Sequence, residues 1–415
     1  MGGYLERFDQ TPATERWPLV RRWMFEEPLP FYAELRKYRP VLAMPDAVLA
    51  ARYADCAEIL RRFDVFSVRL YGPKQGDYWM AQDDTAIHWR EKSVMRAILD
   101  REDIPAIRTY VENKAVEILR AARGEIDAVD GLTRAIPIAL VQDWFGFVDS
   151  DPKELQRWSY WNQMDAFWNQ PFDAVAVADP ARIVEEREAA NAAMRPYLIG
   201  LVQRRAAELQ AGAGGNDPVS RLLKLSFSKA LEFEVDRVVL NLGGLLIGAV
   251  ETTSHACVNA LDGLLRRPEW LDRARAAAAA GDLATFDGCV FEALRFKPAF
   301  PYFFRVCEKD TLLARGSDYQ TPIAAGQTVL AVTHSAMFDE LAFARPDEFL
   351  PDRERSNMFH FGLGLHECLG RAIGAVMIPE IVRQALLLPD LQVGRIDRQG
   401  GPVPEHWAWR WKCRS

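Results

Sequence analysis

Apolar residues recur at intervals of three and four along most of residues 84–300, which predicts a series of helices with one apolar face each. After residue 300 this spacing gives way to short alternating segments separated by prolines, a pattern typical of brief strands and coil. Alternation also occurs at 41–52. At the C-terminus, Trp407, Trp409 and Trp411 would share one face of a strand. We therefore expect a mainly α-helical chain with small β-sheets.

Composition and charge exclude several classes of function. The chain has 415 residues, of which 49% are hydrophobic, so it is long enough to form a large core. Its 51 basic and 58 acidic residues give a net charge of −7, which does not suggest nucleic-acid binding. The six cysteines lie far apart without a C-x-x-C pair. This spacing argues against a disulfide framework or a structural zinc site, and it fits a reducing cytoplasm.

No segment is expected to anchor the chain in a membrane. The longest apolar stretch, 238–250, is too short to cross a bilayer and is interrupted by Asn241 and by glycines. The N-terminus lacks the basic start and the apolar run of a signal peptide. We therefore expect a cytoplasmic protein without a membrane anchor.

The candidate chemistry is concentrated in residues 361–370, which read FGLGLHECLG. Cys368 lies in a glycine-rich turn, directly before an apolar segment with helical spacing. A cysteine at the start of a helix meets the partial positive charge of the helix N-terminus, which favours the thiolate. A lone cysteine is more often an inert packing residue. The glycine-rich turn, however, would let a flat macrocycle approach the sulfur, as in a haem-thiolate site.

The spacing between four residues of this segment resembles the signature of a known family. Phe361, Gly364, Cys368 and Gly370 match every fixed position of the haem-binding signature of cytochromes P450, Phe-x-x-Gly-x-x-x-Cys-x-Gly. The resemblance implies the cytochrome P450 fold, haem b as cofactor, and Cys368 as the axial thiolate ligand of its iron. It also implies one domain over 1–415. The expected parts of that domain are a helix-rich region at 84–300, a strand and coil meander at 301–360, a haem-binding loop and helix at 361–385, and a C-terminal strand region at 386–415.

A second motif lies inside a long apolar helix pattern, at 248–253. Glycine weakens a helix, and a threonine hydroxyl can bond the carbonyl one turn back and bend it. The segment resembles the P450 oxygen-activation motif (Ala/Gly)-Gly-x-(Asp/Glu)-Thr, with Ala249 in place of the second glycine. The resemblance implies a kinked helix in which Thr252 bonds the bound dioxygen and Glu251 relays protons. A regular helix with a surface-facing Glu251 and Thr252 is the alternative.

The resemblance also assigns supporting residues. Glu292 and Arg295 are three apart on a helix and could pair, and together with Arg353 they would support the cysteine loop. His88 and Lys92 stand where the family has His-x-x-x-Arg for a haem propionate, and the lysine keeps the charge but loses a bidentate clamp. Nearby Arg90 or Arg96 could serve instead. The full set of expected haem-binding residues is Cys368, His88, Lys92, Arg305, His366, Phe361, Gly362, Gly370 and Ala249.

Aromatic residues in the segments that line substrate pockets of the family indicate a hydrophobic substrate. The expected pocket residues are Tyr78, Phe167, Trp168, Leu245, Phe300 and Phe303. Packing in the core is the equally weighted alternative for these aromatic side chains. The sequence contains no fused reductase, so dioxygen chemistry would need an external electron donor, a ferredoxin or flavodoxin with its reductase.

These features together predict a haem-thiolate monooxygenase that inserts one oxygen atom into a hydrophobic organic substrate. One alternative is a P450-fold enzyme that uses a peroxide substrate, namely a peroxygenase, isomerase or dehydratase. Another is a non-catalytic haem-binding or sensor protein. Neither alternative needs the acid–alcohol pair Glu251–Thr252, which serves dioxygen activation.

Overall fold

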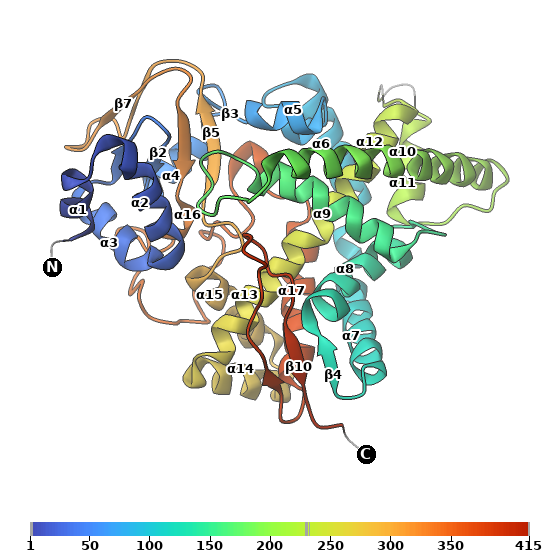
Figure 1. Cartoon of the computed structure of the whole chain (residues 1–415). Helices are drawn as coiled ribbons and strands as arrows, with labels where there is room; N and C mark the ends of the chain where they lie inside the picture. The colour runs from blue at the N-terminus through green and yellow to red at the C-terminus, as the bar shows by residue number, and fades with distance from the viewer. Residues whose placement is uncertain (1–2, 229–230, 232, 414–415) are drawn as a thin grey trace. The chain divides into compact units, whose positions relative to one another are not determined.

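The computed structural model describes residues 3–228, 231 and 233–413 (Figure 1). It is mainly helical, with 59% helix and 8% strand, which confirms the predicted fold class. Contacts group the chain into two compact units, which are described separately below. Unit 1 comprises residues 1–85, 170–176 and 295–368. Unit 2 comprises residues 86–169, 177–294 and 369–415. The expectation of one domain over 1–415 stays a prediction.

Unit 1 is built on a five-stranded sheet with the strand order β1-β2-β8-β5-β3. Its strands are β1 (Val41–Ala43), β2 (Val48–Ala50), β3 (Phe66–Ser67), β5 (Phe303–Cys307) and β8 (Thr328–Ala331). A separate two-stranded sheet is formed by β6 (Thr311–Leu313) and β7 (Thr321–Ile323). The helices of the unit are α1 (Tyr4–Gln10), α2 (Ala13–Glu26), α3 (Pro28–Tyr38), α4 (Tyr53–Arg61), α5 (Gly72–Gln75) and α16 (Thr333–Ala336).

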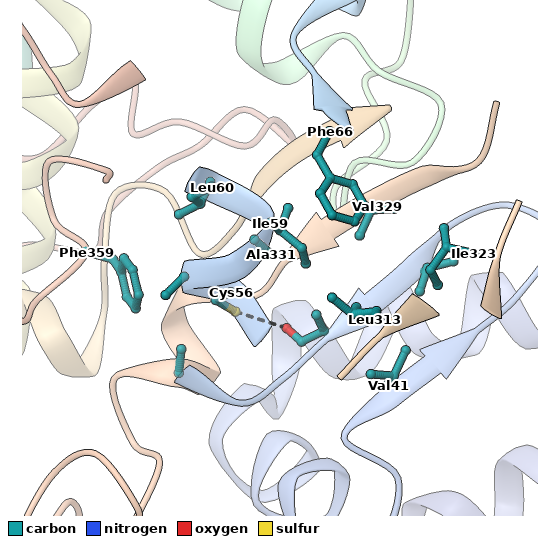
Figure 2. Close-up of a cluster of buried hydrophobic side chains, with 14 of the residues drawn as sticks. Val41, Cys56, Ile59, Leu60, Phe66, Leu313, Ile323, Val329, Ala331 and Phe359 are labelled. Carbon is teal, nitrogen blue, oxygen red and sulfur yellow. Dashed lines mark hydrogen bonds between the residues drawn. The ribbon is translucent and has the colours of Figure 1, made fainter. Parts of the chain in front are cut away.

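The five-stranded sheet separates two apolar cores. Alternate residues of β2 and β8 point to opposite faces, because side chains along a strand alternate between the two sides of a sheet. Val48 and Val329 belong to one core, shown in Figure 2, whereas Leu49 and Leu330 belong to the other. In the first core the Cys56 thiol donates to the Ala50 carbonyl at 3.3 Å. The sheet thus fixes β5, which carries Arg305, between two packed layers.

Unit 2 contains most of the long helices, as the apolar spacing over 84–300 predicts. They are α6 (Ala86–Ile98), α7 (Ile104–Ala121), α8 (Ala135–Ala139), α9 (Pro152–Trp168), α10 (Pro180–Gln210), α11 (Pro218–Ser226), α12 (Val235–Ala249), α13 (Glu251–Leu265), α14 (Pro268–Ala280) and α17 (Arg371–Leu386). Helix α15 (Leu283–Phe296) begins in unit 2 and ends in unit 1. A π-helical segment, η4 (Val129–Arg134), precedes α8.

Helix α13 is buried along almost its whole length and packs against α17 and η4. The C-terminal part forms a small sheet in the order β4-β10-β9, from β4 (Glu125–Asp127), β10 (Ala408–Arg410) and β9 (Gln392–Val393). Trp407 and Trp409 are buried there, with ring centroids 5.1 Å apart, and the expected strand is present over Ala408–Arg410, whereas Trp411 lies beyond its end. Strand β4 immediately precedes η4 in the sequence. The pairing of β10 with β4 therefore brings the C-terminal segment next to η4.

Candidate functional site

The cysteine loop of unit 1 is held by its own backbone. The Cys368 N–H donates to the Phe361 carbonyl at 2.8 Å, and a single helical turn (Gly364–His366, η7) fills the loop. Gly362 and Gly364 have φ values of +71° and +75°, which favour glycine. At Gly364 an added Cβ would also lie 2.6 Å from the Leu60 carbonyl oxygen, so only glycine fits. Helix α17 begins at Arg371, three residues after the cysteine.

Cys368 differs from most other cysteines of the chain. Its side chain is exposed, whereas Cys56, Cys257, Cys289 and Cys307 are buried. Burial raises the pKa of each of these four thiols, because an apolar environment disfavours the thiolate. Cys368 therefore has the accessibility that a metal-ligating thiolate needs. Of the neighbouring predicted residues, Phe361 and Gly362 are half-buried in the loop, and Gly370 directly precedes α17.

Arg305 in β5 is 5% exposed, and its Nη1 donates to the Phe304 carbonyl at 2.8 Å. Within the residues that the structure describes, the guanidinium forms no ion pair. Burial lowers the pKa of Arg305, although Tyr71 and Asp83 nearby oppose this effect. A buried cation without a carboxylate partner is costly, and a bound anion would remove that cost. A haem propionate fits this requirement.

His366 meets an acid that the sequence did not indicate. Its Nε2 lies 3.1 Å from Asp83 Oδ1, and the other oxygen of Asp83 accepts the Val68 N–H at 3.1 Å. The role of His366 as a propionate donor stays a prediction, with one ring nitrogen already engaged by Asp83. No local signal distinguishes Asp83, which lies 283 residues from the histidine along the chain.

Helix α6 of unit 2 carries the other expected propionate ligands. His88 is fully buried and Lys92 is 3% exposed, whereas Arg90 is half-buried and Arg96 exposed. A lysine is buried only where anions or acceptors compensate its charge, which favours Lys92 among these three cations as the anion ligand. Glu91, which lies between His88 and Lys92 in the sequence, pairs with Arg237 of α12 at 2.5 Å. This ion pair fixes α6 against α12.

The long apolar helix is broken where the sequence predicts it. Helix α12 ends at Ala249 and α13 begins at Glu251. The Thr252 hydroxyl donates to the Gly248 carbonyl at 2.8 Å, one turn back, and the Gln163 amide of α9 donates to the Ile247 carbonyl. The kink is therefore confirmed. Because the Thr252 proton is donated to Gly248, Oγ1 presents its lone pairs to any further partner.

Glu251 is buried, so the alternative of a surface-facing glutamate is wrong. Its Oε2 accepts a hydrogen bond from Arg134 Nε at 3.0 Å and lies 2.9 Å from Nη2 of the same guanidinium. Within the described residues Oε1 has no hydrogen-bond partner. Burial raises the pKa of Glu251 to about 7. Arg134 opposes that rise, whereas the carboxylates of Glu405 and Asp130 add to it. A buried carboxyl with this pKa can load and release a proton near neutral pH.

Arg295 and Arg353 converge in unit 1. Arg295 donates to the carbonyls of Met337 and Glu348 at 3.1 and 3.0 Å. Arg353 donates to the same Glu348 carbonyl at 3.3 Å and to Ala344 at 2.7 Å. Both arginines therefore hold the coil that precedes the cysteine loop. Glu292, the third predicted member, is buried in α15, and its supporting role stays a prediction.

The expected pocket residues are divided between the units. Tyr78, Phe300 and Phe303 belong to unit 1 and are half-buried, with the rings of the two phenylalanines stacked at 6.4 Å. Phe167 and Trp168 are half-buried at the end of α9 in unit 2. Leu245 is buried in α12 of the same unit. Their contact with a substrate stays a prediction.

A polar cavity of about 300 Å³ opens on unit 2. None of the expected pocket residues lines it. Its lining consists of Asp130, Arg134, Lys153, Gln156, Arg157, Tyr160, Glu405 and His406. Sequence reasoning missed this cavity and Arg134, because its lining comes from segments up to 276 residues apart.

Among the described residues, no helix combines the length and apolar character required to span a bilayer. Curated relatives include a steroid C26-monooxygenase of Mycolicibacterium smegmatis, 26% identical over 68% of this chain. The cytochrome P450 monooxygenase PikC of Streptomyces venezuelae is 28% identical over 73% of the chain. The matched regions span 63% and 65% of these relatives, slightly under two thirds of their lengths.

Solved structures share the fold at low sequence identity. CalO2 superposes with a TM-score of 0.78 at 21% identity, covering 95% of this chain and 97% of the other. CYP109E1 from Bacillus megaterium, in complex with testosterone, gives 0.76 at 18% identity, covering 97% and 100%. A model of the family described as Cytochrome P450 matches residues 33–388, which is most of the sequence. This chain belongs to the cytochrome P450 family.

Proposed function

We propose that the chain is a haem-thiolate monooxygenase that uses dioxygen and electrons from an external donor to insert one oxygen atom into a hydrophobic organic substrate. The observation that carries the proposal is the acid–alcohol pair at the break between α12 and α13. Glu251 is buried with a pKa near neutrality, and the Thr252 hydroxyl bonds the helix backbone. An enzyme that used a peroxide substrate, or a haem sensor, would not need this pair.

The cofactor of the family is haem, whose iron is bound by a cysteine thiolate. We assign that cysteine to Cys368, because it is exposed in a backbone-closed glycine loop at the start of α17. Arg305 is the best-supported propionate ligand, since it is buried without an ion pair in the described part of the chain. His88, Lys92 and His366 complete the proposed set.

Bound haem supplies the oxygen activation, and the protein supplies position, protons and a pocket. Glu251 would take up a proton on its carboxyl group and release it from the same group. The Thr252 hydroxyl donates its own proton to the Gly248 carbonyl, so Oγ1 would act as a hydrogen-bond acceptor beside Glu251. Thr252 Oγ1 would thus hold the proton that Glu251 releases in a fixed position. In a regular helix the backbone around Val250 would be closed by its own hydrogen bonds. The break there would let the side chains of Glu251 and Thr252 reach the bound substrates.

The substrate class rests on the pocket and on relatives. The aromatic residues Tyr78, Phe167, Trp168, Phe300 and Phe303, together with Leu245, favour an apolar substrate. One relative is named a steroid C26-monooxygenase, and one structural neighbour holds testosterone. Steroids are therefore the first class to test. We propose a ferredoxin or flavodoxin with its reductase as the electron donor.

The test of the axial ligand is the absorbance difference spectrum of the reduced, CO-bound protein. The wild type should give the red-shifted Soret band of a thiolate-ligated haem, and Cys368→Ala should lose it. Cys413→Ala is the matched control, because Cys413 is also exposed but lies outside the loop. Loss of the band only in Cys368→Ala supports the assignment, and its retention there overturns it.

The test of the reaction compares oxygen sources. With a surrogate ferredoxin and its reductase, the wild type should oxidise a steroid that shifts its spin state, and Thr252→Ala should release more reducing equivalents as hydrogen peroxide. Product formation from hydrogen peroxide alone, with Thr252→Ala as effective as the wild type, would show a peroxygenase instead.

A further inference from the structure

Arg134 of η4 is shared by three carboxylates. Its Nη2 lies 2.9 Å from Glu251 Oε2 and 3.1 Å from Glu405 Oε2, and its Nη1 lies 2.8 Å from Asp130 Oδ1. Glu251 Oε2 accepts its hydrogen bond from Nε of the same guanidinium at 3.0 Å, and Glu405 Oε2 accepts one from Nη2, so a single guanidinium holds both acids. Any change in the charge or position of Glu405 changes the strength with which Arg134 holds Glu251.

The three acids differ in their access to water. The side chain of Glu251 is 6% exposed, that of Glu405 is 15% exposed and that of Asp130 is 47% exposed. Glu405, Asp130 and Arg134 all line the polar cavity of about 300 Å³, whereas Glu251 does not. Arg134 thus contacts a buried acid and also lines a cavity that opens at the surface of unit 2.

Glu405 is itself fixed in place. The Tyr160 hydroxyl of α9 donates to its other carboxylate oxygen, Oε1, at 2.7 Å. The Glu405 N–H donates to the Asp397 carbonyl at 2.8 Å, and the His406 ring lies 2.7 Å from Asp127 of β4. A carboxylate anchored at both oxygens and through its backbone is a defined partner for Arg134 and not a solvated surface acid.

From this arrangement we infer that Glu405 is a positioning residue for the catalytic acid, which it keeps available for protonation by sharing Arg134. The inference rests on the proposed function for the role of Glu251. Arg134 does not transfer a proton itself, because a guanidinium stays protonated at any working pH. The proton that Glu251 takes up comes from hydronium, which leaves water behind, and it forms the O–H bond that Glu251 later breaks.

Electrostatics support the geometry. Burial raises the pKa of Glu251 and Arg134 opposes the rise, while the negative charges of Glu405 and Asp130 reinforce it. The Tyr160 hydroxyl of α9 contacts Glu405 and stays neutral, because burial and the charge of Glu405 raise the pKa of Tyr160. With Glu405 ionised, Glu251 binds a proton more tightly and competes less well for Arg134. Without that charge, Glu251 would be ionised more often and clamped more firmly.

The experiment is an infrared titration of the resting haem protein without turnover. The carbonyl band of the protonated Glu251 is identified by its absence in Glu251→Gln, and its midpoint is followed with pH in the wild type and in Glu405→Gln. Removal of a neighbouring like charge should lower the midpoint by about one pH unit, a roughly tenfold loss of proton affinity. Glu208→Gln is the matched control, because Glu208 pairs with Arg205 in α10 and not with Arg134.

The same variants are then compared by coupling, the fraction of consumed reducing equivalents that appears in product. In Glu405→Gln the pH profile of coupling should move to lower pH by a similar amount, and Glu405→Asp should restore part of it. If Glu405→Gln does not fold, Tyr160→Phe, which frees Glu405 Oε1, should shift the infrared midpoint instead. An unchanged midpoint in the folded variant overturns the inference.

Failure of this inference is distinguishable from failure of the proposed function. If the midpoint stays unchanged while Thr252→Ala still uncouples the reaction, the monooxygenase assignment stands and Glu405 has no part in it. If no dioxygen-dependent product forms with any donor, the proposed function fails, yet the infrared midpoint still reports whether Glu405 acts on Glu251.

Discussion

Two buried arginines, one in each compact unit, have opposite electrostatic environments. Arg134 of unit 2 contacts the carboxylates of Glu251, Glu405 and Asp130. Arg305 of unit 1 donates to a backbone carbonyl and, among the described residues, forms no ion pair. Burial alone lowers the pKa of a guanidinium, and it does so for Arg305. For Arg134 the carboxylates outweigh burial and raise the pKa.

The difference indicates what each arginine is for. Arg134 contacts three carboxylates, and Glu251 is the most deeply buried of them, so burial raises the pKa of Glu251 and makes it the acid that binds a proton most readily. Arg305 has a positive charge that the protein leaves uncompensated, so it is suited to an anionic ligand. We therefore propose that Arg134 tunes the proton affinity of Glu251 and that Arg305 binds a haem propionate.

The largest expected effect comes from removing the cation that the acids share. Arg134→Leu leaves the buried carboxylate of Glu251 without its partner, and removal of one partner of a buried pair typically costs about 3–5 kcal/mol. The free energy of unfolding, measured with urea near neutral pH, should fall by that order. The loss should be smaller at acidic pH, because protonated carboxyls no longer need the cation.

Arg410→Leu is the control for this variant, because Arg410 pairs with Glu125 and both side chains are exposed. Exposed ion pairs contribute about 0–1 kcal/mol, so its effect should be small and nearly independent of pH. If Arg134→Leu is no more destabilising than Arg410→Leu, the three carboxylates around Arg134 do not depend on its charge, and the contrast with Arg305 fails.

The next effect concerns haem affinity. Arg305→Leu should weaken haem binding by up to about a hundredfold, because a hydrogen bond between charged groups contributes roughly 1.5–3 kcal/mol. The apoprotein should keep its stability, since the variant removes a buried and uncompensated charge. The measurements are the haem content of the purified protein, the rate of haem transfer to an acceptor protein, and urea unfolding of the apoprotein.

Arg295→Leu separates this prediction from a general effect of losing a buried arginine. Arg295 satisfies backbone carbonyls of the coil before the cysteine loop, so its loss should destabilise the apoprotein as well as the haem complex. Full haem retention in Arg305→Leu would contradict the assignment of Arg305 as a propionate ligand.

The same comparison shows how far the sequence could predict the site. The glycine loop around Cys368 and the helix break beside Glu251 and Thr252 were predictable, because each stands in a contiguous motif whose backbone conformation is local. The kink after Ala249 and the strand at the C-terminal tryptophans followed from spacing in the same way. These predictions depend on residues within one or two turns of each other.

The partners of these groups were not predictable. Arg134 reaches Glu251 across 117 residues, and Glu405 is a further 154 residues along the chain. Nothing in the local sequence distinguishes Arg134 from the other arginines, since its value depends on which acids the helix packing brings to it. The burial of Glu251, which excludes the surface alternative, likewise depends on how η4 and the C-terminal segment cover α13.

The smallest expected effect is the pH dependence that Glu251 gives to stability. Its pKa in the folded protein is raised to about 7 from the ordinary value of 4.5, so the folded state binds the proton more tightly than the unfolded state. The stabilisation by this proton is complete below the unfolded pKa and is lost as pH rises through the folded one. Between roughly pH 6 and 7 this single group should lower the free energy of unfolding by about 1 kcal/mol.

Glu251→Gln isolates that contribution, because glutamine does not titrate. The difference in unfolding free energy between wild type and variant should change by about 1 kcal/mol over that interval and level off above it. Asp173 of unit 1 is a matched control, since burial also raises its pKa to about 7 although its partners are the neutral Tyr302 hydroxyl and a backbone N–H. A pH slope that vanishes in Asp173→Asn and persists in Glu251→Gln would assign the titration to unit 1, and Arg134 would then hold Glu251 permanently ionised.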